Sequence, residues 1–321
     1  MNKPTIPATL QAAILHYADP TNCLEYLVWK RWPNGVVCPT CGGTKVNFME
    51  KHQRWQCSSH HSKRQFSIKT GTIFEDSPLG LDKWLPAMWL LTNAKNGISS
   101  WEIHRALGVS QKTAWFMMHR IRLTHQGKDG GKMGGNGGEI EVDETFIGQK
   151  ARNMHKTKRA EKIQGRGTQG KEIVFGMMER GGDVRVMHIE KRTKKELQST
   201  IREHVEAGAA IFSDELLSYD GLESDYKHAV INHAVEYVNG NVHTNGMENF
   251  WSLLKRGLHG TYVSVEPFHL FRYLDEQAFR FNNRNDMNDA DRFDLAVSNI
   301  FGKRIMYKEL TGKEPLAALA S

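Results

Sequence analysis

The sequence predicts an α/β protein in which a strand-rich region follows a small cysteine-containing module and a helical unit. Apolar runs at residues 139–147, 172–179 and 184–190 are typical of short strands, and helical spacing marks residues 194–207. A glycine-rich segment separates these elements from the N-terminal third of the chain. This order of elements favours a mixed sheet with flanking helices.

Length and charge set the frame for this prediction. The chain has 321 residues with 39% hydrophobic content, enough for two or three domains with real cores. Its net charge of +7 favours a polyanionic partner, although a mildly basic protein without one is the alternative. No run of about eighteen apolar residues and no signal-peptide pattern is present, so we expect no membrane association and a cytoplasmic location.

The N-terminal module carries two short pairs of metal-ligand residues. Cys38 and Cys41 are followed by two glycines, and fifteen residues later Cys57 and His60 form a second pair. Two such knuckles offer four ligands to one tetrahedral structural Zn²⁺ ion, so the module is expected to be a zinc ribbon. The two-residue spacing favours His60 over His61 as the fourth ligand. A reduced, buried cysteine pair without metal is the alternative.

Two short elements are expected after the ribbon. Residues 66–74 alternate enough to form a short pair of hairpin strands, and residues 81–96 carry apolar side chains at helical spacing.

Residues 98–115 are typical of a helix, a turn and a second helix. Ser100 is a candidate N-cap, Gly108 allows the turn, and Ser110 is placed to cap the second helix. In such units the first side chains of the second helix meet the edges of DNA bases. The candidates for this contact are Gln111, Lys112 and Thr113. An ordinary helical hairpin is the alternative.

The glycine-rich segment at residues 127–138 is predicted to form no packed element, because ordering glycine costs the most backbone entropy. It is therefore the clearest domain boundary in the chain. The expected division is residues 1–78 for an N-terminal helical segment and the ribbon, 79–126 for the helical unit, 127–138 for the linker, 139–300 for the strand-rich domain, and 301–321 for a C-terminal tail.

Further elements are expected in the strand-rich domain. Strands are predicted at residues 209–212 and 229–232, and residues 269–283 have the pattern of an amphipathic helix. A basic stretch at residues 150–171 is suited to contact with phosphates, with a solvated loop as the alternative. Its candidate DNA-binding residues are Arg152, Lys156, Lys158 and Arg159.

Three acids stand at the ends of predicted elements. Asp143 ends the run Glu-Ile-Glu-Val-Asp, Asp214 ends Ala-Ala-Ile-Phe-Ser-Asp, and Glu248 lies near the start of a predicted helix. Hard divalent cations take oxygen ligands, and two-metal phosphoryl transfer needs charged bridges between the ions. The acids therefore predict a site for two Mg²⁺ (or Mn²⁺) ions. Because successive strand side chains face opposite ways, Asp143 and Glu144 are not expected to enter the same site unless the strand ends between them, and the same argument separates Asp214 from Glu215.

Glu248 shares one helix face with Asn245, three residues before it, and with Lys255, seven residues after it. A carboxylate is the stronger ligand, so Glu248 is preferred over Asn245, which remains the alternative. Lys255 is placed to hold a phosphate as a compact point charge. Trp251 is expected to pack in the core, and His243 either caps the helix or takes part in the site.

Four segments of the sequence resemble the DDE superfamily of transposases, specifically the insertion-sequence group with a zinc ribbon ahead of an RNase H-like (ISXO2-like) catalytic domain. They are Val-Asp-Glu-Thr-Phe-Ile-Gly at 142–148, Ser-Asp-Glu at 213–215, His-Thr-Asn-Gly-Met-Glu-Asn-Phe-Trp-Ser-Leu-Leu-Lys-Arg at 243–256, and Arg-Phe-Asn-Asn-Arg at 280–284. The resemblance selects Asp143 over Glu144 as the strand ligand. The group usually has cysteine where this chain has His60.

This resemblance implies a transposase that binds the terminal inverted repeats of an insertion sequence and catalyses Mg²⁺-dependent DNA strand cleavage and strand transfer. It implies double-stranded DNA as partner, both as element ends and as target, and a homodimer or higher oligomer on that DNA. The expected setting is prokaryotic and nucleoid-associated. A nuclease or junction resolvase without strand transfer, and a non-catalytic zinc-ribbon regulator, are the alternatives.

Overall fold

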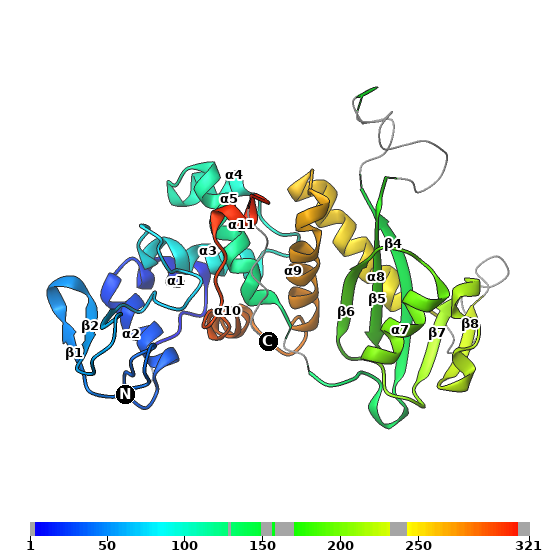
Figure 1. Ribbon diagram of the computed structural model, residues 1–321. Helices are drawn as coiled ribbons and strands as arrows, with labels where there is room; N and C mark the ends of the chain where they lie inside the picture. Colours follow the sequence, from blue (N-terminus) through cyan, green and yellow to red (C-terminus); the bar gives the residue numbers. More distant parts are fainter. Residues whose placement is uncertain (1–3, 128–129, 149–155, 158–169, 232–242, 314–321) are drawn as a thin grey trace. The chain divides into compact units, whose positions relative to one another are not determined.

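The computed structural model divides the chain into two compact units (Figure 1). We call residues 1–126 together with 283–321 the ribbon unit, and residues 127–282 the sheet unit. The residues that the structure describes are 4–127, 130–148, 156–157, 170–231 and 243–313. Within these ranges, every helix is too short or too polar to cross a membrane.

The ribbon unit contains a three-stranded antiparallel sheet. Its strands are β1 (Val46–Met49), β2 (Arg54–Cys57) and β3 (Gln65–Phe66). The expected strand pair over residues 66–74 is wrong, because the chain turns directly after Phe66. Thr70 Oγ1 accepts a hydrogen bond from the Ser67 N–H at 3.1 Å, and Gly71 has a φ of +68°, which a strand does not allow.

An aromatic cluster forms the helical core of the ribbon unit. Phe293 lies 6.0 Å from Tyr26, 5.7 Å from Tyr17 and 5.1 Å from Trp89, measured between ring centroids. This packing joins helices from both ends of the sequence, so the sheet unit ends at Asn282 rather than near residue 300. The helices of this core are α1 (Leu10–Tyr17), α2 (Pro20–Arg31), α3 (Leu81–Asn93) and α10 (Asp289–Ser298).

The expected helix, turn and helix are present as α4 (Ser100–Leu107) and α5 (Gln111–Arg122). Gly108 has a φ of +65° in the turn, and Ser110 Oγ accepts a hydrogen bond from the Thr113 N–H at 3.1 Å. The N-cap of α4 is Ser99 rather than Ser100. Ser99 and Glu102 form a reciprocal capping box, which fixes the start of the helix one residue earlier.

A mixed five-stranded sheet in the order β6-β5-β4-β7-β8 forms the sheet unit, which confirms the expected α/β architecture. β4 pairs antiparallel with β5 and parallel with β7, so the central strand of the sheet is the one that carries Asp143. The strands are β4 (Glu139–Ile147), β5 (Glu172–Glu179), β6 (Val184–Ile189), β7 (Ala210–Asp214) and β8 (Lys227–Ile231). The helices are α7 (Lys194–His204), α8 (Asn245–Arg256) and α9 (Leu270–Asn282).

The two faces of this sheet are covered by different helices (Figure 1). Ile140 and Val142 of β4 pack in one buried cluster with Leu197 of α7. On the other face, α8 and α9 form a second cluster, and α8 approaches β5 closely at Gly176, where a Cβ atom would lie 2.7 Å from the Trp251 ring. Alternation along β4 therefore directs its odd-numbered side chains, Glu141 and Asp143 among them, toward α8.

The second half of the predicted linker packs on the sheet unit, contrary to expectation. Met133 is buried, its N–H donates to the His204 carbonyl at 2.8 Å, and it forms a bridge with Val205. A Cβ atom on Gly134 would lie 2.8 Å from the Cβ of Ala209. The glycines here allow close approach to neighbouring backbone, and Met133 supplies the apolar anchor. The unit consequently starts at residue 127.

Candidate functional site

Three cysteines and one histidine of the ribbon unit form a compact cluster. Among the described residues, the ligand atoms of Cys38, Cys41, Cys57 and His61 lie within 4.8 Å of one another. The sulfurs of Cys41 and Cys57 are 3.6 Å apart, too far for a disulfide and close to the separation of about 3.8 Å between sulfurs at the corners of a zinc tetrahedron. The donor set fits one structural Zn²⁺ ion.

The histidine in this cluster is His61, so the preference for His60 has to be corrected. Nε2 of His61 lies 3.5 Å from Sγ of Cys38, whereas His60 is exposed. The loop after Cys57 closes through a hydrogen bond from the Cys57 N–H to the Arg64 carbonyl at 2.8 Å. The middle of that loop, rather than its start, faces the sulfurs. Two-residue spacing alone did not contain this information.

The local backbone favours the thiolate form of Cys38, which is the form that binds metal. Burial by itself would raise the pKa of this thiol, but hydrogen bonds from the backbone N–H groups of Cys41 and Thr40 hold the pKa below its usual value. Gly42, with a φ of +72°, donates its N–H to the Cys38 carbonyl at 2.8 Å and closes the knuckle. The thiolate form is the metal ligand, so the lowered pKa favours binding.

We expect His61→Ala to lower the zinc content of the purified protein well below one ion per chain, because one of four ligands is lost. His60→Ala, the matched control, should retain one zinc ion. Zinc is measured by elemental analysis after gel filtration. A His61→Ala protein that keeps its zinc while His60→Ala loses it would contradict the assignment.

A second cluster, of carboxylates, lies in the sheet unit. Within the described ranges, oxygens of Asp143, Glu144 and Asp214 lie within 4.8 Å of one another. The structure thus brings together the two aspartates that sequence reasoning singled out, and adds Glu144, which strand alternation had placed away from the site. We call these three residues the acid cluster.

The position of Asp143 explains why Glu144 joins the cluster. Asp143 ends its run of residues but not its strand, because β4 continues to Ile147 and pairs with β5 along its length. Its pairing with β7, however, stops at Glu141 opposite Phe212. Beyond that point none of the described strands pairs with this edge of β4, which lies beside the C-terminal end of β7, where Asp214 is. We call it the open edge of β4. Carboxylates from both faces of β4 therefore reach the same place.

Burial and mutual repulsion raise the pKa values of two members of the acid cluster. Burial raises the pKa of Asp143 to about 6, and the charges of Asp214 and Glu248 add to the effect. Burial likewise raises the pKa of Glu144 to about 7, with contributions from Asp214 and Asp143. A divalent cation would relieve this repulsion, and oxygen donors alone are what Mg²⁺ and Mn²⁺ take. The cluster therefore fits such ions.

Two neutral donors hold the acid cluster in place. Nε1 of Trp251 donates a hydrogen bond to Oδ2 of Asp143 at 2.9 Å, so Trp251 packs in the core as expected and also orients a carboxylate. The Tyr219 hydroxyl donates to Oε2 of Glu144 at 2.7 Å. Tyr219 was not predicted, since a single 3-10 turn such as Leu217–Tyr219 gives no periodic signal.

The third predicted ligand stands on α8. Glu248 is exposed in its first turn and lies outside the 4.8 Å acid cluster, yet its charge acts on Asp143. Asn245 is the first residue of the helix and is also exposed, and Lys255 is partly exposed near its end. The shared face of these residues follows from their helical positions.

A buried glutamate joins β4 to the start of α8. Glu141 is 1% exposed and accepts hydrogen bonds from Nε of Arg180 and from the Met247 N–H, both at 3.0 Å. Nδ1 of His243 lies 3.3 Å from Oε1 of Glu141. His243 thus lies next to Glu141, and the N-cap position of α8 belongs to Thr244. Nothing in the sequence pattern singled out Glu141 as part of the site.

The predicted DNA-contacting side chains of α5 lie at its N-terminus. Gln111 donates a hydrogen bond to Ser100 Oγ at 2.9 Å, and the exposed Lys112 places its ammonium 4.8 Å from the Tyr307 ring centroid. The Thr113 hydroxyl lies 2.8 Å from that of Ser110. Of the basic stretch, Lys156 is exposed, while Arg152, Lys158 and Arg159 lie outside the described residues.

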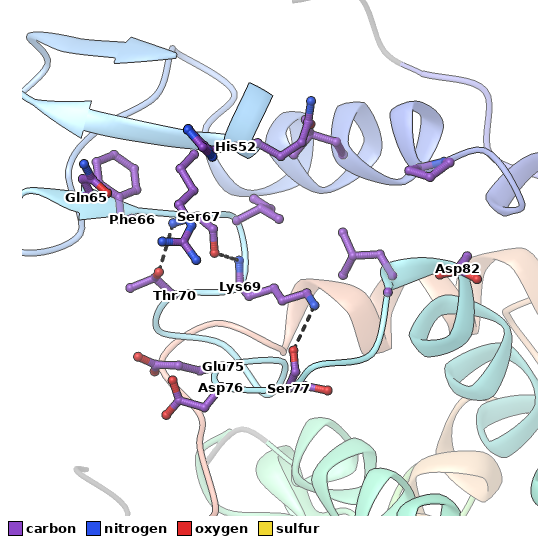
Figure 2. A pocket seen from close by; sticks show the side chains of 17 residues that line it. His52, Gln65, Phe66, Ser67, Lys69, Thr70, Glu75, Asp76, Ser77 and Asp82 are labelled. Carbon is purple, nitrogen blue, oxygen red and sulfur yellow. Dashed lines mark hydrogen bonds between the residues drawn. The ribbon is translucent and has the colours of Figure 1, made fainter. Parts of the chain in front are cut away.

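A pocket of about 520 Å³ lies in the ribbon unit, between the small sheet and the helices (Figure 2). Its lining mixes cationic and anionic side chains, among them Arg54, Glu75 and Asp82. The Lys69 ammonium is directed at the Ser77 carbonyl, which it contacts at 3.2 Å, and burial lowers its pKa. Glu75 and Asp76 form ion pairs with Arg304, outside the lining, and no residue of the acid cluster lines the pocket.

Comparison with known proteins matches both parts of the chain to transposase families. Residues 136–282 match the ISXO2-like transposase domain, and residues 19–63 match the transposase zinc-ribbon domain. These ranges contain the acid cluster and the cysteine–histidine cluster, respectively.

Two curated proteins are similar over substantial parts of their length. An uncharacterized protein in transposable element ISH50 of Halobacterium salinarum is 29% identical over 241 residues, which are 71% of this chain and 79% of that protein. An uncharacterized transposase-like protein of Haemophilus influenzae is 36% identical over 84 residues, 26% of this chain and 68% of that protein. A chain from the crystal structure of a pre-cleavage Mos1 transpososome aligns over its full length (100%) with 95% of this chain, at 11% identity. The TM-score of 0.26 is too low to add to the fold assignment.

Proposed function

Because the chain belongs to the transposases that combine a transposase zinc ribbon with an ISXO2-like transposase domain, we propose that it binds the terminal inverted repeats of an insertion sequence and catalyses Mg²⁺-dependent strand cleavage and strand transfer. The observation that carries this proposal is the acid cluster at the open edge of β4. Incubation of the purified protein with its own element ends should give cleaved 3′ ends in Mg²⁺ and none after chelation.

In this proposal Asp143 and Asp214 hold two Mg²⁺ (or Mn²⁺) ions together with Glu248, and Glu144 offers a further oxygen. When bound, such ions lower the pKa of an attacking water or 3′ hydroxyl and stabilise the leaving oxygen. The protein orients these ligands through Trp251, which fixes one Asp143 oxygen. Asn245 remains the alternative to Glu248 as the helix ligand.

The remaining residues of the site act on the DNA. Lys255 lies two turns after Glu248 on α8 and is suited to hold a backbone phosphate near the acid cluster. Each chain has one such cluster among its described residues, so cutting and joining two element ends together takes at least two chains. We therefore propose a homodimer or higher oligomer on the DNA.

Recognition of the element ends is assigned to the ribbon unit. We expect Lys112→Ala to weaken binding to the terminal repeat more than binding to scrambled DNA, because base contacts carry about 1 to 3 kcal/mol of discrimination each. Lys156→Ala should weaken both alike through a lost phosphate contact. The measurement is a pair of salt titrations on cognate and scrambled duplexes.

Lys83→Ala, which removes an exposed charge from α3, serves as the control and should leave discrimination unchanged. Equal loss of affinity for both duplexes in Lys112→Ala would make α5 an electrostatic contact only. Sequence-specific recognition of the element ends would then be assigned to the zinc ribbon.

A further inference from the structure

We infer that Glu141 is a positioning residue that sets the place of the α8 ligand relative to the strand ligand Asp143. This inference rests on the proposed function, because it concerns the geometry of the proposed cation site. Glu141 precedes Asp143 by two residues on β4 and shares its face, while its side chain reaches the third residue of α8. The next residue of that helix is Glu248.

The contact between Glu141 and α8 replaces an ordinary helix cap. Within the described part of the chain, the N-cap residue Thr244 provides no side-chain hydrogen bond to the helix. Oε2 of Glu141 accepts the Met247 N–H at 3.0 Å instead. A carboxylate at a helix N-terminus interacts favourably with the N–H groups and with the helix dipole. The helix start is therefore attached to β4 rather than to its own loop.

Cationic groups hold the other side of the same carboxylate. Nε of Arg180 lies 3.0 Å from Oε1 of Glu141, and Nη2 of Arg180 donates to the His243 carbonyl at 2.8 Å. The guanidinium lies 4.1 Å from the Phe212 ring centroid, on the strand that carries Asp214. Arg180 thus connects the segment entering α8 to β4 and β7, the two strands that supply the acid cluster.

The backbone at the start of α8 is built around this carboxylate. A Cβ atom on Gly246 would lie 2.8 Å from Oε2 of Glu141 and 2.7 Å from Sδ of Met178. Glycine is therefore required for the helix to approach the strand. Apolar residues fill buried sites at less desolvation cost than a charge does, so a buried carboxylate held by a largely buried arginine favours a requirement for geometry at this position.

The test compares Glu141→Gln with Glu139→Gln. Glu139 bonds to the same arginine at 3.0 Å, but its side chain is 39% exposed, so it is a matched control. Glu141→Gln keeps one acceptor for the Met247 N–H and loses the charge that Arg180 requires. We expect Mn²⁺ affinity, measured by calorimetry or electron paramagnetic resonance, to fall about 10- to 100-fold in Glu141→Gln and to change little in Glu139→Gln. Amides at the start of α8 should also exchange hydrogen faster in the metal-free Glu141→Gln protein.

A second pair of variants covers the case in which Glu141→Gln does not fold. Gly246→Ala displaces the start of α8 while all charges stay, and Gly260→Ala adds the same methyl group where nothing lies within 4 Å. Weaker Mn²⁺ binding in Gly246→Ala alone supports the inference. Wild-type affinity and exchange in a folded Glu141→Gln or Gly246→Ala protein overturns it. If the wild-type protein itself binds no Mn²⁺, the proposed function fails as well.

Discussion

Replacing Asp214 or Asp143 by asparagine should lower the rate of DNA strand cleavage at least about a thousandfold, which corresponds to about 4 kcal/mol of transition-state stabilisation. Asparagine preserves the shape of the side chain and removes the charge that a shared cation needs. Binding to the element ends should change little, because it is assigned to the ribbon unit and to basic side chains. The measurement is single-turnover cleavage of labelled end DNA alongside a binding titration.

Glu215→Gln is the matched control for this experiment. It removes an exposed carboxylate directly after Asp214 and should leave cleavage near the wild-type rate. Cleavage at the wild-type rate in Asp143→Asn or Asp214→Asn would remove these residues from the site. Glu248→Gln should be as severe if it supplies the helix ligand, whereas loss of activity on Asn245→Ala alone would give that role to Asn245.

The metal-free protein should lose stability as the pH rises from about 4 to about 7. The folded-state pKa values of Asp143 and Glu144 are raised to about 6 and about 7, so the unfolded chain releases these protons at lower pH than the folded chain. Below the unfolded-state pKa values these groups do not reduce the free energy of unfolding. Above the folded-state pKa values they reduce it by the full amount. This reduction is on the order of 3 kcal/mol for either group and less than additive for both.

Thermal unfolding at pH 5 and pH 8, with and without Mn²⁺, measures this effect. The cation should raise the melting temperature more at pH 8, where both carboxylates are ionised and repel each other. In Asp143→Asn the metal-free protein should lose less stability between the two pH values. An equal Mn²⁺ effect at both pH values, in a protein that remains folded, would contradict the charge repulsion on which the proposed site depends.

The sequence predicted the sheet well, because its strands are short apolar runs with clear ends. The ranges for β4 and β5 agree with those observed, and the observed ends of β6, β7 and β8 differ by one or two residues. Helix α10 was not predicted as part of the ribbon unit. Its place depends on Phe293 packing against aromatic residues more than two hundred positions earlier, which local patterns do not reveal.

The two aspartates of the site could be predicted from the sequence, but the residues around them could not. Asp143 and Asp214 follow from strands whose pattern is strong, and the structure brings them together. Glu144 was missed because alternation places it on the opposite face of β4 from Asp143, yet beside the unpaired edge of the strand both carboxylates reach the same place. His61 and Glu141 depend on a loop path and on the approach of a helix to a strand. Both are tertiary features without a signature in residue spacing.

Strand joining is the measurement that tests the central claim most directly. The purified protein would be incubated with DNA carrying its own element ends, a target plasmid and Mg²⁺, and the products would be sequenced across their junctions. We predict element ends covalently joined through their 3′ hydroxyls to target DNA, and no such junctions with Asp214→Asn. Cleaved ends without any junctions would contradict strand transfer and indicate a nuclease. If the DNA stays intact although the protein is folded and carries zinc, the catalytic assignment itself is contradicted.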